Sequence, residues 1–233
     1  MSDADPYAEW KGWNPADFAA CSAYDDRYFG WHLRRALPQA KAPLRVLELG
    51  YGNGRFMGWL RQGGHRVTGI EMNPRLVEVA RAAGFEAVAE LDALDPAARY
   101  ELIAAFDVLE HVQPAALQPL MGSLAARLAP GGRLLLRFPN GESPFGLWMQ
   151  QGDLTHVHAI GLSKVRQLCA GCSLRLEHSG EPLPWREQPP NRRFGAALSE
   201  LARRAFEWRL RKMYLLPRGL DLAPNQLVVL GRD

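Results

Sequence analysis

One short segment constrains the fold of this chain more than any other. Residues 46–56, VLELGYGNGRF, form a buried-strand pattern that leads directly into a glycine-rich turn and then into a helix. A second apolar run, residues 67–70, ends in Glu71. Glycines after a first strand let the backbone approach a ligand, and an acid at the end of the second strand accepts hydrogen bonds from ribose hydroxyls. The pattern predicts a parallel α/β sheet that binds an adenosine-containing cofactor.

Length and composition set the scale of the fold. The 233 residues suffice for one sizeable domain with appended pieces, and 47% apolar with 23% charged residues is ordinary for a globular protein. No window approaches the roughly 18 uncharged apolar residues of a transmembrane helix, and the first residues lack the apolar stretch of a signal peptide. Cys21, Cys169 and Cys172 are interpreted as free thiols. These features predict a cytoplasmic protein.

Strand and helix patterns alternate along most of the chain, which predicts a Rossmann-like, doubly wound sheet with helices on both faces. We expect an N-terminal helical cap over residues 1–43 and a main domain over residues 44–233. A helical insert, residues 182–219, should precede the last strand. The seven expected strands are residues 45–49, 66–71, 86–89, 101–106, 133–138, 174–178 and 225–230.

The charge of the chain is unevenly distributed. Its net charge is +3, but residues 192–218 hold eight basic and two acidic side chains, so the remainder is slightly acidic. This basic segment could be a solvated helix packed on the domain, a substrate-pocket or dimer contact, or a contact with an anionic membrane. No nucleic-acid partner is expected, because no known module is present. Apolar residues recur in it at helical spacing: Phe194, Leu198, Leu201, Ala205 and Trp208.

The glycine spacing indicates which cofactor the turn binds. Nicotinamide enzymes use Gly-x-Gly-x-x-Gly, because the pyrophosphate sits at the helix N-terminus. This chain instead has glycines at 50, 52 and 54, with Glu48 two residues before the first. A carboxylate there would repel pyrophosphate, but it suits a sulfonium and an α-amino group. S-adenosylmethionine, which has no phosphate, is the predicted cofactor.

Four blocks in this order and spacing resemble the class I S-adenosylmethionine-dependent methyltransferases, over roughly residues 25–180 and the final strand. The blocks are ELGYGNG at 48–54, Glu71, YELIAAFDVLEHV at 100–112 and LAPGGRL at 128–134. Tyr51 stands where a small residue or Cys is more usual, and Glu101 where Asp is more common. The resemblance implies the family's seven-stranded fold and its cofactor.

The resemblance also implies positions for the cofactor. Glu71, with Met72 beside it, should bind the ribose, and Asp92 with Ala93 the adenine, although Glu90 and Asp95 are also near. Phe106, with Asp107 a further candidate, should line the methionine end. The remaining predicted cofactor residues surround the glycine turn: Glu48, Gly50, Gly52 and Gly54.

Methyl transfer to an oxygen benefits from a base of near-neutral pKa, for which histidine is suited. His111 follows the fourth strand, and His156 lies in the polar segment DLTH, residues 153–156, after the fifth. Both are candidate catalytic residues, and Asp153 and His158 are candidate substrate contacts. His156 with Asp153 and His158 could also ligate a metal, but this is not a specific pattern and no metal is predicted. The other histidines are interpreted as structural: His32, His65 and His178.

The function that these features predict is S-adenosylmethionine-dependent O-methylation of a small molecule or a sugar or glycan precursor. The glycan alternative depends on the resemblance of DLTH to methyltransferases of polysaccharide and secondary-metabolite pathways. An N-methyltransferase would need no strong base, and a phenol O-methyltransferase of the ubiquinone-biosynthesis type is a further alternative. Two other classes remain open, a catalytically silent cofactor-binding partner and an NAD-dependent oxidoreductase.

Overall fold

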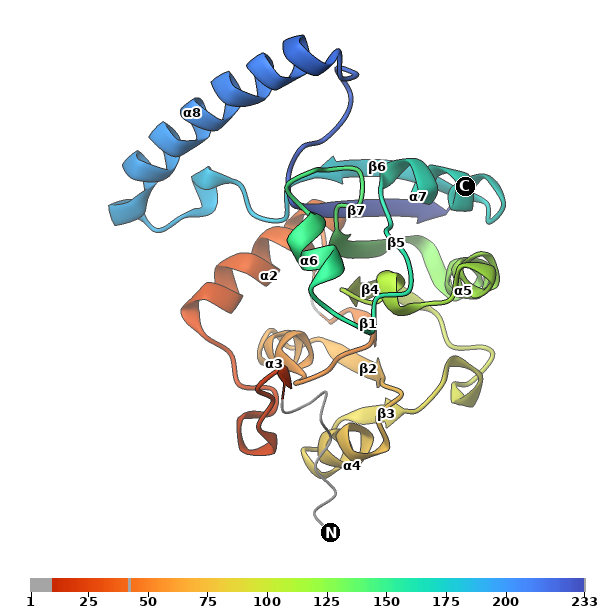
Figure 1. Cartoon of the computed structure of the whole chain (residues 1–233). Coiled ribbons are helices and arrows are strands. Elements are labelled where there is room, and N and C mark those ends of the chain that lie inside the picture. The colour runs from red at the N-terminus through yellow and green to blue at the C-terminus, as the bar shows by residue number, and fades with distance from the viewer. Residues whose placement is uncertain (1–9, 42, 233) are drawn as a thin grey trace.

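A computed structural model describes residues 10–41 and 43–232 and contains a seven-stranded sheet in the order β3-β2-β1-β4-β5-β7-β6 (Figure 1). β7 is antiparallel to both its neighbours, and the other pairs are parallel. This is the predicted Rossmann-like fold. The strands are β1 (Arg45–Leu49), β2 (Arg66–Ile70), β3 (Glu86–Val88), β4 (Tyr100–Phe106), β5 (Leu128–Pro139), β6 (Leu174–Gly180) and β7 (Asn225–Arg232).

Helices cover both faces of the sheet (Figure 1). Local signals fix their ends: Ser22 and Asp25 form a capping box, and Pro74 and Pro114 occupy first-turn positions where a missing N–H costs little. The α-helices are α2 (Ala23–Ala36), α3 (Arg55–Gln62), α4 (Pro74–Ala82), α5 (Pro114–Ala126), α6 (Leu147–Gln151), α7 (Leu162–Ala170) and α8 (Pro190–Tyr214). Short 3₁₀ turns are η1 (Pro15–Asp17), η2 (Leu91–Ala93), η3 (Leu109–His111) and η4 (Trp185–Glu187).

The core side chains of each strand alternate between the two faces of the sheet, because successive residues of a strand point in opposite directions. Val46 and Leu102 pack on one face with Phe29 of α2. Leu47 and Ile103 pack on the other face, in the cluster that contains residues of α5 and α7. All four strand residues are fully buried. Because both faces are covered, the central strands are largely apolar.

Strand register brings the predicted cofactor residues to one edge. Leu49, the last residue of β1, pairs with Ile70 of β2 and Ala105 of β4. The residues that follow these strands, including Gly50 and Glu71, therefore emerge together at the carboxyl edge of the sheet. Gly50 has a positive φ of 67°, and a Cβ there would lie 2.6 Å from the Val108 side chain, so this position needs glycine.

Three elements differ most from the sequence-based expectation. β5 begins at Leu128 rather than at residue 133, because Leu128 already pairs with Tyr100 of β4. The register then shifts across the Pro-Gly segment, so that Leu102 pairs with Arg133. The insert helix is longer than the apolar periodicity over residues 194–208 indicated, since α8 covers Pro190–Tyr214. The short helix α6 was not expected at all.

The N-terminal segment packs on the glycine turn. A Cβ on Gly52 would lie 2.7 Å from the Trp13 ring, and one on Gly54 would lie 2.5 Å from the Phe18 ring. Residues 1–9 and 42 of the predicted cap lie outside the described residues, and the described part contains η1 and α2. The domain boundaries stay a prediction.

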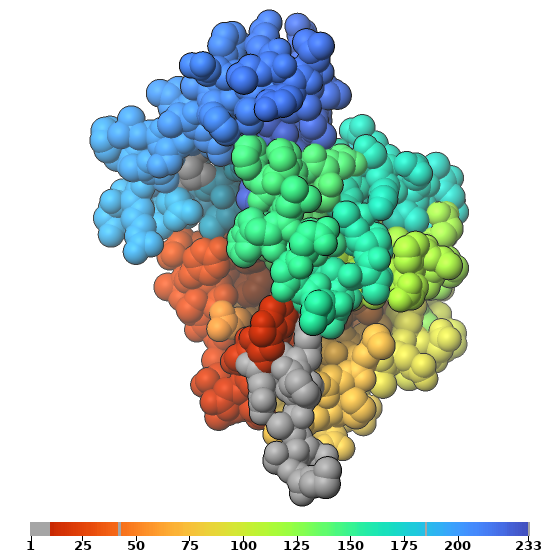
Figure 2. Space-filling model, viewed as in Figure 1, coloured from red at the N-terminus to blue at the C-terminus, as the bar shows by residue number. Residues whose placement is uncertain are grey.

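The helix α8 extends away from the sheet at the top of the molecule (Figures 1 and 2). None of its side chains is buried. Within residues 10–41 and 43–232, no helix has the length and apolar character needed to cross a membrane.

Candidate active site

A cavity of about 780 Å³ opens at the carboxyl edge of the sheet. The loops after β1, β2 and β4 line it, together with the N-terminal segment around Trp13 and with Tyr28 of α2. Open α/β sheets bind ligands at this edge. Eight of the sequence-predicted residues line the cavity: Glu48, Gly50, Gly52, Glu71, Met72, Phe106, Asp107 and His111.

Glu71 joins the two loops of the predicted cofactor end. One carboxylate oxygen accepts a hydrogen bond from the Gly52 backbone N–H at 3.1 Å, and the other accepts one from the Asn73 N–H at 3.1 Å. The carboxylate is thereby held at the cavity wall beside the glycine turn. A ribose whose two hydroxyls donate to a carboxylate fits this position.

Glu48 gives a second indication of the ligand. Its side chain is almost fully buried at the cavity wall, and burial raises its pKa well above the usual value. Among the described residues, its Oε2 atom has no hydrogen-bond partner. A buried carboxylate oxygen without a donor is costly. A cationic ligand with N–H donors would supply one, so the cavity fits the ammonium and sulfonium groups of S-adenosylmethionine.

Three predicted cofactor residues do not line the cavity. Asp92 and Ala93 form the exposed end of η2, beyond the cavity wall. Gly54 is the N-cap of α3 and has a positive φ. The Phe18 ring packs against it. Their cofactor roles stay predictions.

On the other side of the cavity, four side chains form a hydrogen-bonded chain. The Thr155 hydroxyl donates to Asp153 Oδ1 at 2.6 Å and lies 3.0 Å from His111 Nδ1. Lys11 Nζ donates to Asp153 Oδ2 at 3.2 Å. Burial raises the pKa of Asp153, but hydrogen bonds from Thr155 and Lys11 outweigh it and lower the pKa to about 2. Since the Thr155 proton points to Asp153, His111 Nδ1 is the donor and Nε2 the basic nitrogen.

His156 is oriented in the same way. Its Nδ1 lies 2.9 Å from the Gln150 carbonyl oxygen, so Nδ1 carries the proton and Nε2 the lone pair. That Nε2 lies 3.9 Å from Glu110 Oε1 and 3.7 Å from Asp153 Oδ2. The rings of His156 and His111 meet edge to face with centroids 4.7 Å apart. Burial, and then the nearby His156, lower the pKa of His111.

Glu110 lies beneath these two rings and is fully buried. Neither of its carboxylate oxygens has a hydrogen-bond partner among the described residues. Burial raises the pKa of Glu110 to about 7. The ligand atoms of Glu110, His111 and His156 lie within 4.8 Å of one another. The structure thus assembles a different trio from the Asp153, His156 and His158 set that the sequence suggested for a metal.

His158 points elsewhere. Its Nε2 lies 3.0 Å from the Leu109 carbonyl oxygen and its Nδ1 lies 3.2 Å from the Ala159 carbonyl oxygen. These contacts attach its loop to η3. Its predicted substrate contact stays a prediction, as does that of Asp153.

Sequence reasoning missed several cavity residues. Arg137 of β5 lines the cavity and is ion-paired with Asp107. A lone arginine within the apolar run LLLRFP, residues 134–139, is the signal that could have found it. Thr155 lies in the segment DLTH but was not itself singled out, and Lys11 carried no signal, because only the folded loops bring them together with His111 and Asp153.

The chain was compared with known proteins. A family model described as "Methyltransferase domain" matches residues 22–186, well over half of the chain. A ubiquinone biosynthesis O-methyltransferase of Xylella fastidiosa is 38% identical over 103 residues, which is 40% of this chain and 40% of that protein. One of Xanthomonas oryzae pv. oryzae is 32% identical over 105 residues, 41% of this chain and 43% of that protein. The chain therefore matches less than half the length of these relatives.

Solved structures share the fold. A SAM-dependent methyltransferase from Archaeoglobus fulgidus has a TM-score of 0.64 at 17% identity, over 98% of this chain and all of that chain. One from Mesorhizobium loti has a TM-score of 0.59 at 21% identity, over 88% and 98% of the two chains. The chain belongs to the methyltransferase domain family, within the class I S-adenosylmethionine-dependent methyltransferases. The predictions of family, fold and cofactor are thereby confirmed.

Proposed function

We propose that this protein transfers the methyl group of S-adenosylmethionine to a hydroxyl oxygen of a small molecule. One observation carries the proposal: a single cavity connects Glu71 and the glycine turn with His111 and Thr155. Such a cavity can hold the sulfonium and the acceptor oxygen in line, and alignment alone can contribute about 7–11 kcal/mol to a displacement of this kind.

The hydrogen-bonded chain favours oxygen over nitrogen as the acceptor atom. An amine attacks as the neutral base, whereas a hydroxyl must lose its proton as the new bond forms. His111 presents a basic nitrogen because Thr155 and Asp153 fix its other nitrogen as the donor. His111 and His156 are therefore the proposed residues that assist deprotonation.

Two acceptor classes remain, a phenol and a sugar. The relatives named ubiquinone biosynthesis O-methyltransferase favour an acceptor of the ubiquinone-precursor type. The segment Asp153–His156 supports the sugar alternative only through its resemblance to polysaccharide-pathway enzymes. Mass spectrometry of reactions with a panel of catechols and a panel of hydroxylated sugars separates the two classes.

The methyltransferase proposal is tested by calorimetric titration of the full chain with S-adenosylhomocysteine, with NAD as control. Binding of S-adenosylhomocysteine alone, weakened by Glu71→Ala, is expected. Preference for NAD would support the oxidoreductase alternative. Binding without methylation of any acceptor in the panels would support the catalytically silent partner protein.

We further propose that α8 contacts an anionic lipid surface at the cytoplasmic side of a membrane. The half-buried residues Glu200, Arg203 and Glu207 face the body of the protein. The predicted apolar stripe instead faces outward, with Phe194 78%, Leu201 67% and Trp208 62% exposed. The helix also carries the basic excess of the chain. An outward apolar face with arginines beside it suits an anionic bilayer surface.

Co-sedimentation with phosphatidylcholine vesicles, with and without phosphatidylglycerol, tests this contact. The full chain should bind only the anionic vesicles, and Leu198→Ser with Leu201→Ser should weaken binding by about tenfold or more. Arg209→Glu should do the same, whereas Arg209→Lys is the matched control. Dimerisation that the serine variant abolishes, without vesicle binding, would assign the face to a second copy of the chain.

A further inference from the structure

We propose that Arg137 binds a carboxylate group of the methyl acceptor, an assignment that rests on the proposed function and makes the acceptor a hydroxy acid. Arg137 lies near the end of β5 and lines the same cavity as Glu71 and the glycine turn. It interrupts a strand that is otherwise largely buried and apolar. An arginine in such a place needs a partner of opposite charge. Asp107 supplies only part of that partner.

The ion pair of Arg137 with Asp107 leaves both side chains incompletely bonded. A guanidinium has five N–H donors, and within the described part of the chain that of Arg137 donates one hydrogen bond, to Asp107 Oδ2. Arg137 Nε and Asp107 Oδ1 are buried, and neither has a partner among residues 10–41 and 43–232. Asp107 also has a positive φ of 55°, and uncommon backbone conformations of this kind cluster at binding sites. Since buried polar groups without partners are costly, this pair fits a further bonding partner.

The charges around Arg137 favour a ligand group with one negative charge. Asp107 already pairs with the guanidinium, and Glu71 lies at the wall of the same cavity. These carboxylates would repel a doubly charged phosphate more strongly than a carboxylate. A carboxylate also matches the planar fork of a guanidinium and accepts from two of its nitrogens at once. Binding through Nε and a terminal nitrogen, after rotation of the side chain toward the cavity, would supply the acceptor that Nε lacks.

The position of β5 assigns this carboxylate to the acceptor rather than to the cofactor. The strands at the cavity follow the order β2-β1-β4-β5 (Figure 1). Neighbouring strands lie about 4.8 Å apart, so β5 is roughly 10 Å from β1 and roughly 14 Å from β2. The ribose is expected at Glu71, after β2, and the amino group of the cofactor beside Glu48 of β1. The carboxylate of the cofactor is on the same carbon as that amino group, two strands away from Arg137.

Aromatic rings beside Arg137 suit an acceptor that contains a ring. Tyr28, Phe29 and Phe106 line the cavity with it, and the Phe106 centroid lies 6.5 Å from that of Tyr28 and 5.8 Å from that of Phe29. Burial raises the pKa of Tyr28, and the charge of Arg137 opposes that shift, so the guanidinium is close to this ring. A ring face can pack on this wall while Arg137 fixes its carboxylate. A hydroxybenzoate and a sugar acid share this chemistry.

Calorimetric titration of the full chain, with and without S-adenosylhomocysteine, tests the site with two matched pairs of probes. 3,4-Dihydroxybenzoate is compared with 3,4-dihydroxybenzamide, and glucuronate with glucuronamide, because only the acid of each pair is charged. One acid should bind about tenfold more tightly than its amide, and which acid does so separates a phenol from a sugar. Arg137→Met should abolish this preference. Arg133→Met is the matched control, since Arg133 lies on the same strand in an ion pair with Glu177 and does not line the cavity.

A second variant covers the case in which Arg137→Met does not fold. Arg137→Lys keeps the charge but loses the planar fork, so it should bind the acid several-fold more weakly than the wild type and the amide equally well. In both variants the affinity for S-adenosylhomocysteine should change by less than about threefold.

Three results would separate this carboxylate site from its alternatives. A wild type that prefers neither acid over its amide would overturn the site. A loss of about tenfold in S-adenosylhomocysteine affinity in Arg137→Met would also overturn it, because the guanidinium would then bind the cofactor. If S-adenosylhomocysteine did not bind the wild type but the preference for an acid remained, the proposed function would be wrong and the carboxylate site would stand.

Discussion

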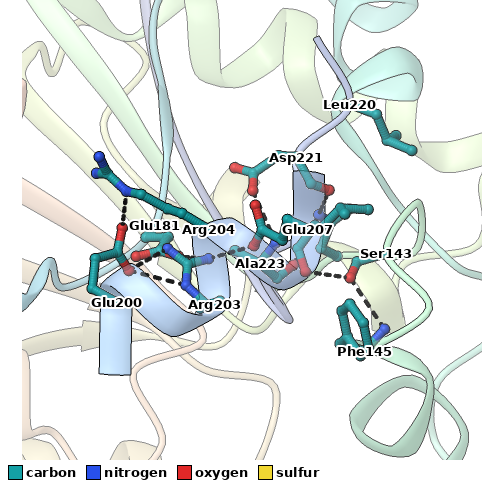
Figure 3. A network of polar contacts seen from close by, with 12 residues as sticks. Ser143, Phe145, Glu181, Glu200, Arg203, Arg204, Glu207, Leu220, Asp221 and Ala223 are labelled. Carbon is teal, nitrogen blue, oxygen red and sulfur yellow. Dashed lines mark hydrogen bonds and ion pairs between the residues drawn. The ribbon is translucent and has the colours of Figure 1, made fainter. Parts of the chain in front are cut away.

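Two clusters of charged side chains lie in this molecule, and they are built differently. The histidine cluster, Glu110, His111 and His156, lies beside the cavity, and the buried carboxylate within it has no hydrogen-bond donor among the described residues. The arginine cluster lies on α8 itself, apart from Glu181, and it pairs each carboxylate with a guanidinium (Figure 3). Its members are Glu181, Glu200, Arg203, Arg204 and Glu207.

The arginine cluster is satisfied by its own members. Arg203 donates to Glu200 at 2.6 Å and to Glu207 at 2.9 Å, and it also pairs with Glu181 (Figure 3). Burial raises the pKa of Glu200, but hydrogen bonds from Arg203 and Arg204 outweigh it and hold the pKa below the usual value. Such a cluster attaches a helix to the domain and needs no ligand. In the histidine cluster, by contrast, the buried Glu110 carboxylate has no hydrogen-bond donor among the described residues and burial raises its pKa, which is typical of functional sites.

The largest effect should come from the histidine cluster. Glu110→Gln is expected to lower kcat by about a hundredfold, because it removes the buried carboxylate that lies beside the two proposed catalytic histidines. The affinity for S-adenosylhomocysteine should change by less than about threefold. Steady-state kinetics with calorimetry measure both. Glu207→Gln, in the arginine cluster, is the matched control and should leave kcat unchanged. A hundredfold loss in the control instead would contradict the contrast between the clusters.

Cofactor binding should depend on the acid beside the glycine turn. Glu71→Ala removes the carboxylate that Gly52 and Asn73 hold at the cavity wall, and it should weaken S-adenosylhomocysteine binding by about 10- to 100-fold. Isothermal titration calorimetry gives the value. Glu78→Ala, on the exposed face of α4, is the control that should bind normally. If both variants bound S-adenosylhomocysteine with equal affinity, Glu71 would not be a cofactor-binding residue.

Stability should depend on pH through Glu48. Burial raises its pKa in the folded state, so the folded protein binds more protons than the unfolded chain above the ordinary glutamate pKa. The free energy of unfolding should therefore fall as the pH rises above the ordinary glutamate pKa, and Glu48 should contribute to that fall. Urea unfolding without cofactor should show a flatter profile for Glu48→Gln. A variant as pH-dependent as the wild type would contradict this assignment.

The smallest effect should come from the arginine cluster. Arg203→Met removes ion pairs that are partly exposed, so the free energy of unfolding should fall by about 1 kcal/mol or less. Urea unfolding measures it, with Arg192→Met on the exposed start of α8 as the control. A loss several times larger would mean that α8 is an integral part of the fold rather than an attached element.

The sequence predicted the sheet well, because its signals are local. The run into Gly50, the acid at Glu71 and the proline at the start of α4 each carry their own physical reason. The seven strands of the sheet were expected from the alternation of patterns and from the family resemblance. β5 was misjudged at its start because pairing with Tyr100 is a long-range contact that no local pattern shows.

The site was harder to predict, because its contacts join distant segments. His111 and His156 were expected at the edge of the sheet, but their contact with the buried Glu110 depends on how the loop after β5 folds back. Lys11 reaches Asp153 across most of the chain. The apolar periodicity of α8 was found correctly, yet it gave no sign that the apolar stripe would face outward.

The structure of the full chain with S-adenosylhomocysteine tests the central account most directly. The ribose hydroxyls should bond to the Glu71 carboxylate, and the amino group should lie beside Glu48. The sulfur should face the side of the cavity that holds His111 and Thr155. A cofactor bound away from Glu71, or a sulfur turned away from His111, would contradict the assignment of this cavity as the place where methyl transfer occurs.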